Sequence, residues 1–125
     1  MINDISFIEK FDGWKIHYEE FVGDFSGVDF KGISLKNCSF EQANLENANF
    51  EGCDLTGVFM SGVNLQGANL DDADLFIADL SGANLNGVSL KNANLMAATI
   101  DGVNFENTNL DGAMLDNRED WLKVL

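Results

Sequence analysis

The sequence has no proline, one histidine and two cysteines in 125 residues, and these shortages exclude several classes of protein. Acid–base or nucleophilic catalysis needs unlike reactive groups that converge in a pocket, and His17 is the one histidine available. No apolar run approaches the roughly 18 residues that a membrane-spanning helix needs. Residues 1–4 do not start a secretory signal, because they have neither a basic region nor a long apolar core. The sequence therefore predicts a cytoplasmic protein that is not an enzyme.

Basic residues are also scarce, since seven Lys and Arg stand against 21 Asp and Glu, for a formal net charge of −14. Direct nucleic-acid binding usually requires a basic stripe, and the sequence offers none, so we expect no such binding. A strongly acidic surface favours positively charged partners or none.

What the sequence does contain is a five-residue repeat, which runs for nineteen units without an insertion from Gly23 to Asn117. Every fifth residue from Phe25 to Leu115, which we name the centre of its unit, is apolar. Two residues before the centre stands a small or branched residue, most often Ala or Val. The residue between them is Asn or Asp in thirteen units, and the residue two after the centre is Gly in ten units.

A period of five fits neither the 3.6 of a helix nor the 2 of a long strand. If three residues are extended, the small residue and the centre point to one side while Asn or Asp points to the other. The last position of each unit then turns the chain, because Gly, Asn and Asp tolerate positive φ. Four such corners close a coil of twenty residues, and successive coils stack as parallel strands with a right-handed connection.

This pattern resembles the pentapeptide-repeat family, and the resemblance covers 95 of the 125 residues. It implies an all-β fold, the right-handed quadrilateral parallel β-helix, with short terminal caps. The best understood group within the family consists of DNA-mimicking proteins that bind DNA gyrase, so the resemblance indicates the architecture more directly than the function.

The two ends of the chain depart from the repeat. Residues 1–22 have helix-like spacing early on, then a turn signal at Asp12–Gly13 and alternation at Trp14, Ile16 and Tyr18, so we expect an N-terminal cap segment. The alternative for its aromatic residues is a binding arm. Residues 118–125 predict a second cap, a short helix that Asn117 begins and in which four apolar residues close the far end. Those residues are Trp121, Leu122, Val124 and Leu125. A weak homodimer through this cap is the alternative.

Cys38 and Cys53 occupy the inward small-residue position, which predicts buried thiols, with a disulfide or a reactive thiol as the alternative. The acidic run from Asp71 to Asp74 lacks the spacing of a helix-loop-helix calcium site, and its members fall on two different sides of the coil. We therefore expect no metal, no cofactor and no catalytic residue.

Units four apart should stack into four walls, and the third wall departs most from the pattern. It comprises the units centred on residues 35, 55, 75, 95 and 115. Five of its outward positions carry apolar residues where other units use polar ones or Gly: Phe76, Ile77, Met96, Ala97 and Met114. We name these five residues the third-wall patch. An exposed patch of this kind is a candidate surface for a partner protein or for self-association, and scattered surface hydrophobes are the alternative.

The leading functional prediction is a non-enzymatic scaffold or protein-interaction module with an unidentified protein partner. One alternative is an acidic DNA mimic that binds DNA gyrase or a related type II topoisomerase. A weaker alternative is a structural homo-oligomer built through the third-wall patch.

Overall fold

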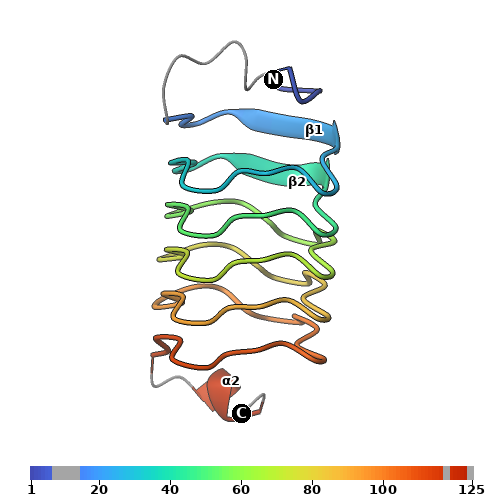
Figure 1. Cartoon of the computed structure of the whole chain (residues 1–125). Helices are drawn as coiled ribbons and strands as arrows, with labels where there is room; N and C mark the ends of the chain where they lie inside the picture. The colour runs from blue at the N-terminus through green and yellow to red at the C-terminus, as the bar shows by residue number, and fades with distance from the viewer. Residues whose placement is uncertain (7–14, 117–118, 124–125) are drawn as a thin grey trace.

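The computed structural model describes residues 1–6, 15–116 and 119–123, and it is a single stack of coils with the two termini at opposite ends (Figure 1). The longer regular elements are β1 (Glu20–Asp24), β2 (Ser39–Asn44) and α2 (Glu119–Leu122). Between β2 and α2 the chain forms short strand segments joined by turns, one segment and one turn per five-residue unit.

Parallel bridges join residues twenty apart, so each coil contains four units, as the sequence predicts. Asn49 pairs with Asn69, and Asn69 pairs with Ser89, in one continuous column. The fifteen centres from Phe25 to Leu95 are 0% exposed, which makes them the interior of the rod. The fold is therefore the right-handed quadrilateral parallel β-helix that the repeat and the family resemblance indicate.

The polar residue before each centre has a specific role in the turn. In every unit where this residue is Asn or Asp, its Oδ1 accepts a hydrogen bond from the backbone N–H two residues later, which forms an Asx turn. The thirteen acceptors are Asp24, Asp29, Asn44, Asn49, Asp54, Asn64, Asn69, Asp74, Asp79, Asn84, Asn94, Asn104 and Asn109. The sequence pattern indicated only that these side chains point outward, and the bond explains why Asn and Asp prevail there.

The corners follow the predicted geometry with one exception. Seventeen residues located two after a centre, from Gly27 to Gly112, have positive φ. The exception is Gln42, where β2 continues through the corner and pairs in parallel with β1. The register shifts between Glu20 and Val22 of β1 in this pairing.

The stack of coils extends upstream of Gly23, where the strict five-residue period begins. Lys15 pairs with Ser34, an offset of nineteen residues instead of twenty, and Ile16 and Phe21 are 3% and 0% exposed. Phe21 stacks on Phe40 with ring centroids 4.4 Å apart. Part of the expected cap segment is therefore a coil that is one residue shorter than the others. The expected features at Asp12–Gly13 and Trp14 lie outside the described residues.

The C-terminal end is closed by α2, in which Trp121 is 2% exposed. The Trp121 ring lies 5.6 Å from the Phe105 ring, and its Nε1 donates to Asp116 Oδ1 at 3.0 Å. Asp116 Oδ2 accepts from the Ala97 amide at 2.8 Å. Corresponding corner amides in earlier coils donate to a backbone carbonyl of the next coil, so the Asp116 carboxylate ends this ladder. The expected features at Asn117, Val124 and Leu125 lie outside the described residues.

Candidate functional site on the third wall

The structure places all five residues of the third-wall patch on one outer face. Phe76 is 43% exposed, Ile77 50%, Met96 39% and Met114 52%, and Ala97 is also exposed. Bridges from Asp74 to Asn94 and from Asn94 to Met114 stack these units directly over one another. The Ile77 amide donates to the Met96 carbonyl at 3.2 Å, so the members of the patch on successive coils are neighbours.

Backbone strain concentrates at the corner of this wall. Among the described residues with positive φ, three are neither Gly, Asn nor Asp: Tyr18 at 60°, Ile77 at 54° and Ala97 at 59°. All three occupy the third-wall corner, since the Tyr18 amide donates to the Lys36 carbonyl as the Ile77 amide donates to that of Met96. For a β-branched or bulky residue this conformation is a true outlier. The three other corners of the coil show no such residue in the described chain.

Tyr18 was not identified as a site residue from the sequence, although it is 78% exposed. It precedes the strict repeat, and the nineteen-residue offset hides its corner position from a search with a period of five. A comparison of Ile16 and Phe21 with Leu35 and Phe40 reveals this offset, because all four are buried centres.

The strained corner of Ile77 lies over a glycine. A Cβ added to Gly57, one coil below, would lie 3.8 Å from Ile77 Cδ1 and would overlap Asn37 Oδ1. Gly57 is buried, whereas corner glycines such as Gly62 are exposed and have open space where a Cβ would be. The Ile77 side chain therefore folds back onto the wall and covers Gly57 with part of its surface.

Carboxylates flank the patch. Residues 71–116 contain eight acidic residues and one lysine, Lys91, which lies on the second wall. Asp74 immediately precedes the patch, and its Oδ1 accepts from the Phe76 amide and from Asn94 Nδ2, both at 3.1 Å. Asp72 and Asp79 occupy the turn before and the strand after. None of these three carboxylates takes part in the ion pairs found within the described part of the chain.

One coil below, Asp54 is compensated differently. Lys36 Nζ lies 3.5 Å from Asp54 Oδ2. Burial alone raises the pKa of the Asp54 carboxyl, but hydrogen bonds from Thr56 and the charge of Lys36 outweigh it and lower the pKa below its ordinary value. Asp72, Asp74 and Asp79 therefore belong to the carboxylates that no ion pair of the described residues compensates.

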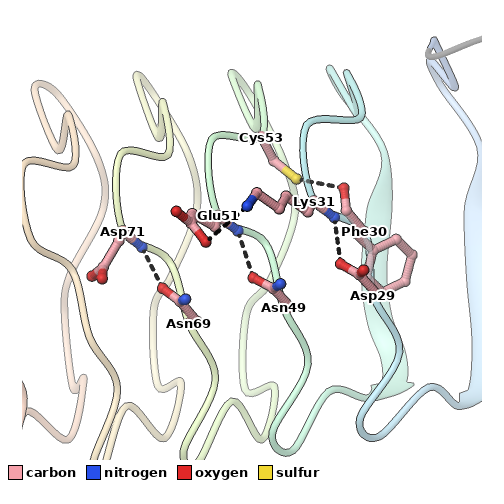
Figure 2. A network of polar contacts seen from close by, with 8 residues as sticks. All are labelled: Asp29, Phe30, Lys31, Asn49, Glu51, Cys53, Asn69 and Asp71. Carbon is pink, nitrogen blue, oxygen red and sulfur yellow. Dashed lines mark hydrogen bonds and ion pairs between the residues drawn. The ribbon is translucent and has the colours of Figure 1, made fainter.

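The second wall shows the polar contacts within a turn and between successive coils (Figure 2). Lys31 Nζ lies 3.6 Å from Glu51 Oε2 in the next coil, and Asn49 Oδ1 accepts from the Glu51 amide at 3.0 Å. Asp71, one member of the acidic run, accepts from the Lys91 amide at 3.0 Å. Its carboxylate thus acts in a turn, and no cluster of three potential metal ligands occurs in the described chain.

Both cysteines are free thiols inside the rod. Cys38 and Cys53 are 0% and 1% exposed, and each Sγ donates to a carbonyl oxygen at 2.9 Å, that of Ile16 and that of Phe30 respectively. Burial raises the pKa of Cys38 to about 11 and that of Cys53 to about 12. At neutral pH these thiols are protonated, which suits the predicted core role and not that of a nucleophile.

His17 has a structural contact at the first coil. Its Nε2 lies 2.8 Å from the hydroxyl oxygen of Ser34, which is 7% exposed.

Among the described residues, α2 is too short and insufficiently apolar to cross a membrane.

These features define the class of protein as a β-helical solenoid, and comparisons with known proteins specify the family. A family model described as pentapeptide repeats matches residues 24–62, 43–76 and 78–117, with eight copies. The chain therefore belongs to the pentapeptide-repeat family. No curated protein matches its sequence.

Three solved structures illustrate the relationship. A pentapeptide-repeat protein of the Arabidopsis thaliana thylakoid lumen is 38% identical, with a TM-score of 0.75 over 82% of this chain and 74% of that one. A pentapeptide-repeat protein from Nostoc PCC 7120 is 30% identical, with a TM-score of 0.74 over 92% and 98%. A third, from the cyanobacterium Cyanothece 51142, is 27% identical, with a TM-score of 0.52 over 82% and 84%.

Proposed function

We propose that the chain is a non-enzymatic pentapeptide-repeat scaffold that binds a partner protein through the third-wall patch. The observation that carries this proposal is the coincidence of exposed apolar side chains with strained corners on one wall. A residue in the left-handed region costs about 1–3 kcal/mol unless it is glycine, and such residues cluster at functional sites. Ile77 and Ala97 combine both properties.

The members of the patch make different contributions to a docking surface. Phe76 and Met96 provide exposed apolar area at equivalent positions of successive coils, and contiguous apolar area marks interaction sites. Ile77 is held over Gly57 and presents a fixed edge. A surface that is already ordered loses less side-chain entropy when a partner binds.

The alternative function, an acidic DNA mimic that binds gyrase or a related topoisomerase, draws on the net charge of −14. The two functions differ in their dependence on salt. The affinity of a mimic should fall steeply as ionic strength rises, whereas the apolar contribution of Phe76 and Met96 to docking should persist.

Site-specific photo-crosslinking tests the proposal. A photoreactive phenylalanine replaces Phe76 in one variant and Gln66 in another, because Gln66 holds the same exposed position on the opposite, first wall. We expect a discrete crosslinked protein from position 76, none from position 66, and loss of the product in Met96→Ser. Equal crosslinking from both walls would contradict the proposal. Inhibition of gyrase supercoiling that weakens with salt and is unchanged in Met96→Ser would replace it with mimicry.

A further inference from the structure

We infer that the segment of the partner that binds the third-wall patch is a cationic amphipathic helix. This inference rests on the proposed function and adds the secondary structure and charge of the occupant. It follows from the satisfied backbone and the spacing of the wall, and from carboxylates in and beside the patch that join no ion pair within the described residues.

The backbone of the wall is closed to an added strand. Within the two coils of the patch, every amide from residue 74 to 78 and from 94 to 98 already donates a hydrogen bond. The Phe76 and Met96 amides are held by Asx turns, and the Ala97 amide by the Asp116 carboxylate. Strand addition depends on free main-chain donors, whereas a helix satisfies its own backbone and docks through side chains alone.

The spacing of the wall suits a helix that lies along the rod. Adjacent coils are about 4.8 Å apart, and one helical turn rises about 5.4 Å, so apolar residues three and four apart would match successive coils. Phe76 and Met96 are related by one coil, as are Ile77 and Ala97. The short Ala97 side chain next to Ile77 leaves room for an apolar side chain of the helix.

The carboxylates around the patch indicate which charge the polar residues of the docked helix carry. Asp72 lies before the patch, Asp74 within the same unit and Asp79 after it, and none of the three joins an ion pair within the described residues. Lys and Arg beside the apolar stripe of a helix would compensate these carboxylates. A second copy of this chain, with its net charge of −14, would be repelled, and so would an anionic membrane surface.

The test uses the full chain and a model peptide of about 18 residues, long enough to form a helix, in which Leu recurs at helical spacing and Lys fills the other positions. Its control has Glu in place of every Lys. Affinity is measured by fluorescence anisotropy at two salt concentrations, and the binding site is mapped from amide chemical shifts. We expect the lysine peptide to bind and to shift third-wall resonances, with much weaker binding of the glutamate peptide.

Two matched sets of variants separate the apolar and the charged contributions. Phe76→Ser with Met96→Ser removes apolar area, and Phe59→Ser on the fourth wall is its control, because Phe59 is 46% exposed. Asp72→Asn, Asp74→Asn and Asp79→Asn remove charge. Asn keeps the turn acceptor at positions 74 and 79 and tolerates the positive φ at position 72. Their control neutralises three acids of the first wall: Asp24→Asn, Glu46→Gln and Glu106→Gln. We expect each patch set to weaken binding about tenfold or more, and each control less than about threefold.

The outcomes distinguish this inference from the proposed function. If both peptides bind equally and binding depends on Phe76 and Met96, docking at the patch stands and the cationic partner is wrong. Shifts spread over all four walls, or equal losses in patch and control sets, would show adventitious charge attraction and overturn the inference. Absence of binding, or concentration-dependent self-association that Met96→Ser abolishes, would also overturn it, in the latter case in favour of a second copy.

Discussion

The strained corner at Ile77 leads to an unusual expectation, namely that removal of a large apolar side chain stabilises the protein. Asn is the natural replacement, since Asn37, Asn47, Asn92 and Asn107 occupy equivalent corners with φ between 57° and 60°. In Ile77→Asn the turn is kept and the steric conflict between the branched side chain and the backbone is relieved.

The magnitude follows from two opposing terms. Relief of a left-handed non-glycine residue contributes about 1–3 kcal/mol, and the upper part of that range suits a β-branched side chain. Full burial of Ile contributes about 1.5–3 kcal/mol, and Ile77 is 50% exposed, so about half of that is lost. The net expectation is an increase of about 1 kcal/mol, or roughly 3–5 °C in Tm for a domain of this size.

The assay is urea unfolding followed by circular dichroism, with Phe76→Asn as the control. Phe76 is adjacent and similarly exposed, at 43%, but its φ is not positive, so Asn there removes apolar burial without relief of strain. We expect Ile77→Asn to raise the urea midpoint and Phe76→Asn to lower it. If both variants lost stability equally, the strain argument and the proposal that depends on it would be refuted.

Three further expectations concern the corners, the core and the thiols. Gly62→Ala should lower the free energy of unfolding by about 1 kcal/mol, because alanine is strained at the positive φ of this corner. Gly57→Ala should lower it further, because the added Cβ would also overlap the Asn37 side chain one coil below. Equal urea midpoints for the two variants would contradict this steric difference. Leu85→Ala should lower the free energy of unfolding by about 2–5 kcal/mol, because Leu85 is fully buried. A Tm within about a degree of that of the parent protein would exclude a role for this centre in the core. Cys38 and Cys53 have raised pKa values in the folded chain, so the protonated thiols stabilise the fold. Their contribution to the free energy of unfolding is complete below about pH 9 and is lost as pH rises toward 11–12. Unfolding at about pH 8 and about pH 10.5 should reveal this loss, about 2 kcal/mol per thiol, and a variant with Ala at both positions should lack it.

The sequence was sufficient to predict the interior of the rod because the relevant information is strictly local. Residues five apart lie on neighbouring walls, and residues twenty apart lie on the same wall of successive coils. Leu65 and Leu85 could therefore be assigned to the interior from their spacing alone. The same arithmetic placed Phe76 and Met96 on one face. The register held because no insertion interrupts the units.

The features that the sequence did not predict depend on geometry within a unit or on a change of register. The Asx turns need the distance between a side-chain oxygen and an amide two residues later, which polarity alone does not give. Tyr18 was missed because its coil is one residue short. Gln42 keeps the period but not the corner, since β2 continues as a strand there. The strain of Ile77 could be suspected from its residue type, but its φ of 54° is a property of the folded backbone.

The two ends of the rod differ from its middle in a way that bears on how its length can change. The short coil at Ile16 and the Asp116 carboxylate that joins Ala97 to Trp121 terminate the stack, and each contacts the adjacent coil. Between them, removal or duplication of any twenty consecutive residues would restore every column in register. The rod can therefore lengthen or shorten in steps of one coil, about 4.8 Å, without a redesign of either end. A coil added before residue 71 would move the third-wall patch away from the N-terminal end, while the contact between Ala97 and Asp116 stayed the same.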